Sequence, residues 1–199
     1  MHRRVLRAHG NCPALFEGRG SRVYDVVARR LVRGLYRRIA DDLVEAVPEG
    51  ADVLDVGTGP GVLLLELAGR RPDLRLSGVD LSADMVATAQ RNVRQFAERV
   101  TVRLGDVVEL PFPDHSFDVV VTSLSMHHWD HPGAAVPELA RILRPGGRLF
   151  VYDFGHAPFD VLTDTARERG VLGGRPVRPT TIRTGIPVLS RCVRQVMTA

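Results

Sequence analysis

Acidic side chains stand at or near the ends of several short apolar runs in this sequence. They are Asp55, Asp80, Asp106 and Asp153, and a further apolar run ends at Ser123. If the runs are parallel strands of one sheet, their carboxyl ends meet at one edge, where such sheets bind ligands. Four carboxylates around one crevice repel one another unless they receive hydrogen-bond donors or a cation. For any single acid a helix cap or a turn is an equally good explanation, but the set predicts a binding edge.

A glycine-rich turn, Val53–Gly61 with the sequence VLDVGTGPG, could supply the backbone of this edge. Gly57, Gly59 and Gly61 lack a Cβ atom, so the turn can adopt positive φ and a ligand can lie against bare backbone. Pro60 suits the first turn of a helix, whose unpaired N–H groups and partial positive charge would face the ligand. A tight strand-to-helix connection without a ligand explains the glycines equally well when they are taken alone.

Two adjacent histidines, His127 and His128, follow the apolar run that ends at Ser123, where a substrate should lie. An imidazole titrates near neutral pH and can act as a general base. The alternative is that one ring packs against its neighbours while the other is a solvated loop residue. Asp153 is a weaker candidate for the base. The histidines lack further ligands at the spacing of a metal site, so no metal is predicted.

The elements that must position these residues alternate along the chain. We expect five strands, at residues 53–56, 74–79, 100–104, 117–123 and 148–153. We also expect helices at 60–67, 83–98, 134–143 and 159–169, followed by two antiparallel strands at 177–184 and 188–197. Strands that alternate with helices imply a parallel sheet. The predicted fold class is therefore α/β: a doubly wound, seven-stranded, mostly parallel sheet with an antiparallel C-terminal edge and an N-terminal helical cap.

The domain organisation follows from the same pattern. Residues 1–20 contain glycine and proline without periodicity and are predicted to be a loose lead-in. Residues 21–199 are predicted to form a single domain, with the helical cap at 21–47 and the sheet-containing core at 51–199. Apolar residues recur every four positions from Val23 to Val47. Because this repeat drifts off one face of a helix, we expect two helices or a kink near Gly34.

Length and composition indicate one globular domain. The 199 residues are 44% hydrophobic and 25% charged, which is enough apolar content for a sizeable core. No apolar stretch is long enough to span a bilayer, and the arginine-rich N-terminus lacks the apolar region of a secretory signal. Cys12 and Cys192 are too few and too far apart for a disulfide framework, so a reducing cytoplasm fits.

The charge is distributed unevenly along the chain. All 27 basic residues are arginine, which we interpret as compositional bias. Residues 1–39 hold ten arginines against two acids, residues 40–164 ten against twenty, and residues 165–199 seven against one. Basic ends could contact nucleic acid or a membrane surface peripherally. We favour docking of the ends on the acidic middle of the chain, because no aromatic or basic groove motif accompanies the charge.

The ordered motifs resemble those of class I S-adenosylmethionine-dependent methyltransferases. The matching stretches span about two thirds of the chain in the right order and spacing, at residues 53–61, 78–82, 105–106, 117–123 and 143–149. Within that class, Tyr24-Asp25 and Met126-His127-His128 resemble the small-molecule branch, which includes the ubiquinone/menaquinone biosynthesis methyltransferases. The resemblance implies a Rossmann-like methyltransferase fold and S-adenosylmethionine as the cofactor.

The resemblance also implies which residues hold that cofactor. Gly57, Thr58 and Gly59 would pass beneath its methionine part. Asp55 would order the polar end of the methionine, and Asp80 would accept hydrogen bonds from both ribose hydroxyls, since a carboxylate offers two oxygens.

The adenine would lie on a second group of residues. Asp106 would accept a hydrogen bond from the adenine amino group, and the backbone N–H of Val107 would face the ring. Leu81 and Met85 would pack on its flat face, although ordinary helix core also explains Met85.

Two further contacts are implied, and one alternative cofactor is disfavoured. The carbonyl region of Ser123 would meet the amino group of the methionine, and Tyr24 would cover the site from the N-terminal helix. A dinucleotide is disfavoured, because Val62 stands where the dinucleotide fingerprint needs its third glycine. An acid-rich edge also suits a cationic sulfonium better than a pyrophosphate.

The implied reaction is methyl transfer to a small acceptor that is quinone-like, aromatic or a natural product. The main task is then in-line placement of the acceptor, with His127 or His128 as an optional base. Only residues 155–158 separate the fifth strand from the next helix, so the acceptor pocket is open or is closed by residues 1–40 or a second subunit of a homodimer. The alternatives are a non-catalytic cofactor-binding regulatory protein, or an RNA methyltransferase that uses the basic ends. No RNA-binding module supports the latter.

Overall fold

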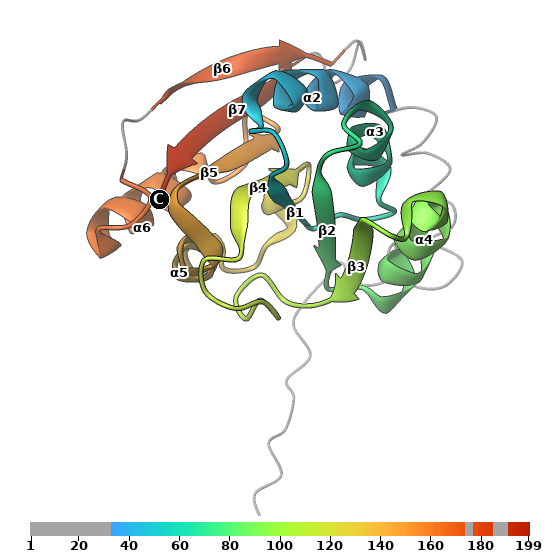
Figure 1. Ribbon diagram of the computed structural model, residues 1–199. Helices are drawn as coiled ribbons and strands as arrows, with labels where there is room; N and C mark the ends of the chain where they lie inside the picture. Colours follow the sequence, from blue (N-terminus) through green and yellow to red (C-terminus); the bar gives the residue numbers. More distant parts are fainter. Residues whose placement is uncertain (1–32, 174–176, 185–190) are drawn as a thin grey trace, which may run out of the picture.

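A seven-stranded sheet runs through the centre of the computed structural model, which describes residues 33–173, 177–184 and 191–199 (Figure 1). The strands lie in the order β3-β2-β1-β4-β5-β7-β6. Their bounds are Asp52–Val56 (β1), Arg75–Asp80 (β2), Val100–Leu104 (β3), Phe117–Ser123 (β4), Leu143–Asp153 (β5), Val177–Arg183 (β6) and Arg191–Thr198 (β7). β7 is antiparallel to both β5 and β6, so β6 runs in the same direction as β1 to β5. The predicted fold class is confirmed.

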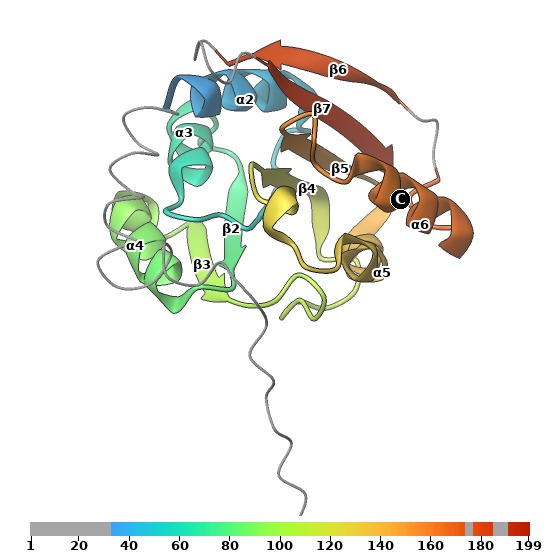
Figure 2. The same cartoon turned by 180° about the vertical axis from the view of Figure 1, so that it is seen from behind.

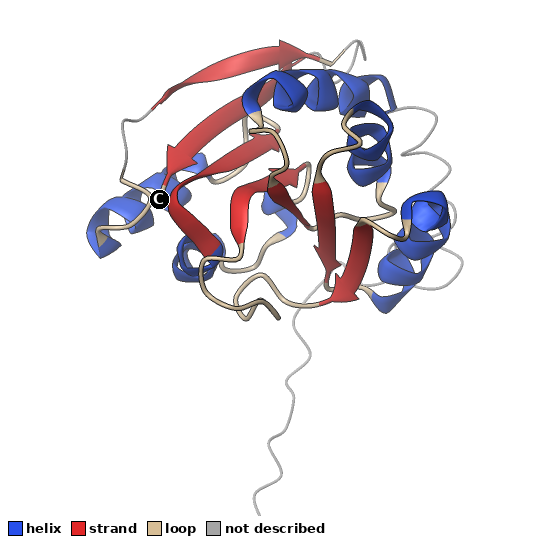
Figure 3. Ribbon diagram, in the orientation of Figure 1, coloured by secondary structure: helices blue, strands red, loops and turns tan. Residues whose placement is uncertain are grey.

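Five helices and two short 3-10 turns connect the strands in the described part of the chain (Figure 3). The helices are Arg33–Ala46 (α2), Val62–Arg70 (α3), Ala83–Val93 (α4), Pro132–Ile142 (α5) and Phe159–Arg169 (α6). The 3-10 turns are Arg94–Phe96 and Met126–His128. α2, α3 and α4 gather on one side of the sheet and α5 and α6 on the other, as the reverse view also shows (Figure 2). None of the helices within the described ranges is long and apolar enough to cross a bilayer.

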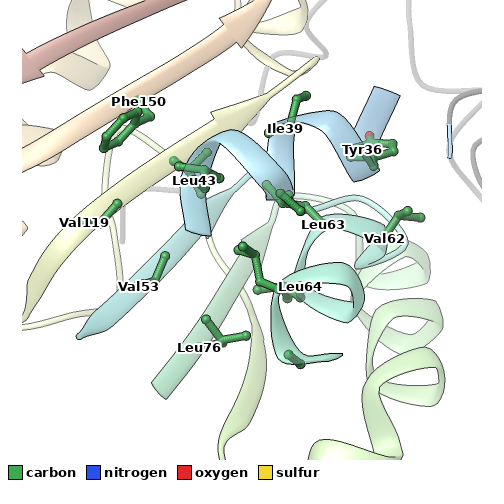
Figure 4. Close-up of a cluster of buried hydrophobic side chains, with 14 of the residues drawn as sticks. Tyr36, Ile39, Leu43, Val53, Val62, Leu63, Leu64, Leu76, Val119 and Phe150 are labelled. Carbon is green, nitrogen blue, oxygen red and sulfur yellow. The ribbon is translucent and has the colours of Figure 1, made fainter. Parts of the chain in front are cut away.

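Alternate residues of the central strands face two separate apolar cores. In β1, Val53 packs with side chains of α2, α3 and α4, whereas Leu54 packs with side chains of α5 and α6. Figure 4 shows part of the first core, in which Leu43 of α2 lies near Phe150 of β5, and Ile39 and Val53 belong to the same cluster. Both faces of the central strands are therefore buried, and polar side chains can reach solvent mainly at the strand ends.

The order of the strands creates a switch point between β1 and β4. From β1 the chain moves outward through β2 to β3 and then returns to place β4 on the other side of β1. Asp55 pairs with Val121, and Val56 pairs with Thr122. This register brings the start of the glycine turn beside Ser123. Ligands of doubly wound sheets bind beyond the carboxyl ends of the strands at such a point.

The largest differences from the predicted element bounds are at the start of β5 and the end of α4. β5 begins at Leu143 rather than at 148, because Leu143 pairs with Phe117 ahead of an irregularity in the register between β4 and β5. α4 ends at Val93, and the chain continues as the tighter 3-10 turn Arg94–Phe96. Neither difference moves a residue that was predicted to lie at the carboxyl ends of the strands.

α2 is the part of the predicted N-terminal cap that the structure describes. It is described from Arg33, one residue before Gly34, so the two helices or kink expected near Gly34 stay a prediction. The residues before α2, which include the predicted lead-in and Tyr24, lie outside the described residues. The carboxylate of Asp42 accepts hydrogen bonds from the hydroxyl of Tyr152 at 2.6 Å and from the guanidinium of Arg194 at 2.6 Å. These bonds attach α2 to β5 and β7, so the helix is joined to the sheet by polar contacts as well as by its apolar face.

Ion pairs join the amino ends of the central strands. Asp52 of β1 pairs with Arg75 of β2 at 2.6 Å and with Arg144 of β5 at 2.9 Å. Arg144 also pairs with Asp118 of β4 at 2.5 Å. The hydrogen bond from Arg75 is the largest influence on the pKa of Asp52 and keeps it below the usual value, although burial raises it. We call these four side chains the amino-edge network, because they connect four strands at one edge of the sheet.

Candidate functional site

The glycine turn after β1 has the conformation that its sequence predicts. Gly57, Gly59 and Gly61 have φ angles of 68°, 53° and 74°, in the left-handed region that glycine tolerates best. The backbone N–H groups of Gly57 and Thr58 both donate to the carbonyl of Val79, at 2.9 and 3.0 Å. The turn is therefore held against the end of β2, and α3 starts directly after it.

Two of these glycines make room for neighbouring side chains. A Cβ atom on Gly57 would lie 1.8 Å from the Oγ of Ser125, so Ser125 fills the space beside that glycine. A Cβ atom on Gly61 would lie 3.0 Å from the Cβ of Ala89, so Gly61 allows α3 and α4 to pack closely. The contact between Gly57 and Ser125 is one that sequence reasoning missed.

Asp80 connects the end of β2 to the glycine turn. Its Oδ2 accepts a hydrogen bond from the backbone N–H of Gly59 at 2.8 Å, and its Oδ1 accepts one from Ser82 at 2.9 Å. Burial raises the pKa of Asp80, and the backbone hydrogen bonds from Ser82 and Gly59 oppose that effect. Each carboxylate oxygen can accept a second hydrogen bond, so Asp80 is oriented by the chain and can still bind a ligand.

Asp55 is a buried carboxylate beside the same turn. It is 1% exposed, and its Oδ2 accepts a hydrogen bond from the hydroxyl of Thr58 at 2.7 Å. Its Oδ1 is buried without a hydrogen-bond partner among the described residues. Burial raises the pKa of Asp55 to about 7, against the hydrogen bond from Thr58, and the charge of Asp80 adds to the rise. Because an unpaired buried oxygen is costly, a donor or a cation at Oδ1 would be strongly favoured.

The ends of β2 and β3 lie side by side. Asp80 pairs with Leu104, and the N–H of Gly105 donates to the carbonyl of Asp80 at 3.0 Å. This brings Asp106, the next residue, to the same edge of the sheet. Asp106 is exposed and accepts a hydrogen bond from the backbone N–H of Val108 at 3.1 Å, within its own turn.

The residues expected to meet an adenine differ in exposure. Leu81 is 72% exposed, although it is a large apolar side chain, and Val107 is half-buried. Met85 is 2% exposed and belongs to the interior of α4. Leu81 therefore offers apolar surface to a ligand, whereas Met85 is placed as a core residue.

The predicted histidine pair lies on the 3-10 turn Met126–His128, which follows β4. The Nδ1 of His127 lies 2.7 Å from the Oδ1 of Asp153, which is completely buried at the end of β5. Asp153 also accepts hydrogen bonds from the backbone N–H of His127 at 3.1 Å and of Phe154 at 2.8 Å. A carboxylate oxygen accepts, so in this contact the Nδ1 of His127 would be the donor and its Nε2 would be left as an acceptor. This is the arrangement of a general base held by an orienting carboxylate.

Other rings surround this pair. The ring of His128 lies 3.9 Å from that of His127, and burial, followed by the charge of His127, lowers the pKa of His128 while Asp153 opposes the shift. The ring of Phe154 lies 5.3 Å from that of His127, and His156 stacks on Phe154 at 5.7 Å with an angle of 12° between the rings. The ends of β4 and β5 thus carry a surface of four rings, two of which were not predicted from the sequence.

The strained backbone of Leu124 sets the direction of the loop that carries His127 and His128. Leu124 follows Ser123, which is 4% exposed at the end of β4, and has a φ angle of 54°. A left-handed conformation costs a residue other than glycine about 1–2 kcal/mol. The N–H of Leu124 donates to the carbonyl of Tyr152 at 2.7 Å. The sharp turn carries Ser125 back over Gly57.

Arginine is absent from the ion pairs of this edge in the described part of the chain. Of the four acids, Asp55, Asp80, Asp106 and Asp153, only Asp153 has a basic partner there, and that partner is His127. Across the described ranges, no three or more His, Cys, Asp or Glu side chains are grouped so as to hold a metal ion. We call Asp55, Asp80, Asp106 and Asp153 the carboxyl-edge acids.

Tyr24, the remaining predicted residue, lies outside the described residues.

Comparison with known proteins gives concordant matches. Residues 54–151 match the family described as "Methyltransferase domain". The chain is 35% identical over 136 residues to the ubiquinone/menaquinone biosynthesis C-methyltransferase of Geobacter sulfurreducens, which covers 66% of this chain and 53% of that protein. It is 37% identical over 139 residues to the demethylmenaquinone methyltransferase of Thermus thermophilus, which covers 68% and 62%. It is also 40% identical over 129 residues to the nocamycin O-methyltransferase of Saccharothrix syringae, which covers 64% and 45%.

These matches cover only part of the relatives, since the chain spans about half to three fifths of their length. Among solved structures, a methyltransferase from Aquifex aeolicus superposes with a TM-score of 0.69 at 21% identity, over 89% of this chain and 96% of that one. The [4+2]-cyclase SpnF superposes equally well, with a TM-score of 0.69 at 18% identity, over 89% and 94%. At these identities the superpositions show that the fold is shared.

Proposed function

We propose that this chain, a class I methyltransferase whose residues 54–151 match the methyltransferase domain family, transfers a methyl group from S-adenosylmethionine to a small acceptor. When bound, this cofactor supplies a methyl group activated on a positively charged sulfur. The contribution of the chain is then to bind the two reactants, align them in line and accept a proton where the acceptor loses one.

The observation that carries the proposal is the state of the carboxyl-edge acids. In the described residues none of the four pairs with an arginine, and the Oδ1 of Asp55 is buried without a hydrogen-bond partner. A cofactor with a cationic sulfonium and an ammonium group supplies the positive charge and the donors that this edge lacks. The residues present therefore fit the cofactor.

Each part of the edge suits one part of the cofactor. Asp80, oriented by two backbone hydrogen bonds, would accept the ribose hydroxyls. Leu81 and the N–H of Val107 would contact the adenine, with Asp106 at its amino group. Met85 would support Leu81 from the core of α4.

The amino-acid part would lie along the glycine turn. Thr58 and Gly59 would pass beneath it, beside Gly57. Its ammonium group would meet Asp55 and the carbonyl region of Ser123. Tyr24 would cover the site from the N-terminal segment.

We assign the role of base to His127, with His128 as the second candidate. Asp153 holds the Nδ1 of His127 at 2.7 Å, so the free lone pair is on Nε2 and can take a proton from a phenol or hydroxyl of the acceptor. The positive charge that forms on His127 is stabilised by the buried carboxylate beside it. An acceptor that has no proton to lose would not need this step.

The acceptor is proposed to be quinone-like, aromatic or a natural product. The rings of His128, Phe154 and His156 gather around the proposed base His127, and those of Phe154 and His156 are stacked with an angle of 12° between them. The similar proteins include enzymes named for ubiquinone/menaquinone biosynthesis and for nocamycin O-methylation, which supports this class. We place the protein in the cytoplasm on the basis of its cysteine usage.

A methyl-transfer assay tests the proposal. The protein is incubated with S-adenosylmethionine and a panel of quinols, phenols and enols, and S-adenosylhomocysteine is measured. We expect product with at least one class. At a cofactor concentration near the wild-type Kd we expect Asp80→Ala to form much less product, whereas Asp160→Asn, which changes an exposed acid on α6, should form as much as the wild type. Cofactor binding without product from any class would favour the non-catalytic alternative. Absence of cofactor binding would refute the proposal.

A further inference from the structure

The side chain of Ser125 stands between the glycine turn and the histidine pair. A Cβ atom on Gly57 would lie 1.8 Å from the Oγ of Ser125 and 2.6 Å from its Cβ. Ser125 therefore fills the space beside Gly57, on the turn that the proposed cofactor would touch. Its position depends on Leu124, which turns the chain sharply after β4 with a φ angle of 54°.

The same serine anchors the loop that carries the proposed base. Its Oγ accepts a hydrogen bond from the indole Nε1 of Trp129 at 3.1 Å. Its carbonyl accepts one from the N–H of His128 at 2.9 Å, and the N–H of Trp129 donates to the carbonyl of Met126 at 3.0 Å. These three bonds close a compact loop around His127 and His128, with Ser125 at one end and Trp129 at the other.

We propose that Ser125 is a positioning residue that links the glycine turn to the histidine pair, so that binding of the cofactor on the turn is transmitted to the acceptor side of the site. The inference rests on the proposed function. Close packing means that a small shift of Gly57 on binding must move Ser125 as well. The bond from Ser125 to Trp129 then carries that shift across the loop that holds His127.

The sequence provides a probe for this link. Trp129 is the only tryptophan of the 199 residues, so indole fluorescence reports on this loop alone. A change in the hydrogen bond or the packing of Trp129 alters its emission. The chain also offers a matched control, because the hydroxyl of Ser116 donates to the carbonyl of Pro113 at 2.7 Å, ahead of β4 and at the opposite end of that strand from Ser125.

The experiment titrates the full chain with S-adenosylhomocysteine and follows binding in two ways. Calorimetry gives the Kd, and indole emission reports the state of Trp129. For the wild type we expect a saturable change of emission with the same Kd as calorimetry. For Ser125→Ala we expect the emission change to be lost while the Kd stays within about fivefold, the equivalent of one neutral hydrogen bond. Ser116→Ala should behave as the wild type.

The possible failures separate this inference from the proposed function. Calorimetric binding to the wild type without any change of emission would overturn the link and leave the proposed function standing. This arm needs no variant, so it remains decisive if Ser125→Ala does not fold. An unchanged emission response in Ser125→Ala would also overturn the link. Absence of calorimetric binding to the wild type would instead refute the proposed function, and the link with it.

Discussion

The acidic residues at the amino ends of the strands have different partners from those at the carboxyl ends. At the amino edge, Asp52 and Asp118 are paired with Arg75 and Arg144 across four strands. At the carboxyl edge, the four acids receive backbone N–H groups, the hydroxyl of Thr58 and the ring of His127, and none pairs with an arginine in the described ranges. The chain contains 27 basic residues, all arginine, so the contrast does not reflect a shortage of positive charge.

The difference shows in the pKa values. The arginines lower the pKa of Asp52, whereas burial raises the pKa of Asp80 and raises that of Asp55 to about 7. Paired acids stabilise the fold by joining strands. Buried acids without a counter-charge cost stability, and such costs are typical of sites prepared for a ligand. We propose that the amino edge serves the fold and the carboxyl edge serves binding.

The largest expected effect concerns the base. Asp153→Asn removes the carboxylate that holds the Nδ1 proton of His127, so Nε2 becomes protonated and can no longer accept. We expect kcat for a hydroxyl acceptor to fall by about 10²–10⁴-fold, the usual contribution of a general base, while the calorimetric Kd for the cofactor changes little. Asp118→Asn at the amino edge is the matched control and should leave kcat unchanged. Equal kcat in the two variants would contradict the claim that Asp153 at the carboxyl edge supports catalysis whereas Asp118 at the amino edge does not.

The second prediction concerns stability against pH. Because the pKa of Asp55 in the folded protein is raised to about 7, its contribution to stability is present at low pH and is lost as pH rises through that value. The effect should reach up to about 4 kcal/mol. We therefore expect Asp55→Asn to unfold at a higher denaturant concentration than the wild type above pH 7, and to bind the cofactor more weakly. Denaturant unfolding measures the stability and calorimetry measures the cofactor affinity, each at several values between about pH 5 and pH 8. This range extends about two units below and one unit above the pKa of Asp55. A variant that is less stable than the wild type above pH 7 would contradict this account.

The smallest effect is expected at the amino edge. Arg144→Ala breaks the pairs with Asp52 and Asp118, but all three side chains are partly exposed. Screened pairs of this kind contribute about 0.2–1 kcal/mol each. We expect a loss of stability of about 1 kcal/mol, partly relieved in high salt, and no change in cofactor affinity. A change in cofactor affinity larger than about twofold, or about 0.4 kcal/mol, would contradict the claim that the amino edge does not take part in cofactor binding.

The sequence was sufficient for most of the fold. Glycine and proline mark the ends of elements, apolar runs mark the buried strands, and both signals are local. The positions of Asp55, Asp80, Asp106 and Asp153 followed, because residues after parallel strands meet at one edge whatever the detailed packing. The positive φ angles of the glycine turn followed from its composition in the same way.

The details of the acceptor side could not be read from the sequence. Asp153 meets His127 across 26 positions of the chain, and that contact depends on how β4 and β5 pair. The fit of Ser125 over Gly57 depends on the left-handed conformation of Leu124, which no residue preference would predict. Met85 shows a different difficulty. A helical residue beside the site is as often a core residue as a ligand contact, and the sequence does not distinguish the two; in the structure Met85 is buried.

The most direct test of the account is a calorimetric titration of S-adenosylmethionine into the wild type and into one variant from each edge. We expect the wild type to bind and Asp80→Ala to bind about 10–100-fold more weakly, equivalent to the loss of about 1.5–3 kcal/mol of hydrogen bonds to a charged group. We also expect Asp52→Ala to leave the Kd unchanged. No binding to the wild type, or an equal loss of affinity in the two variants, would contradict the claim that the carboxyl-edge acids are kept for a cationic cofactor.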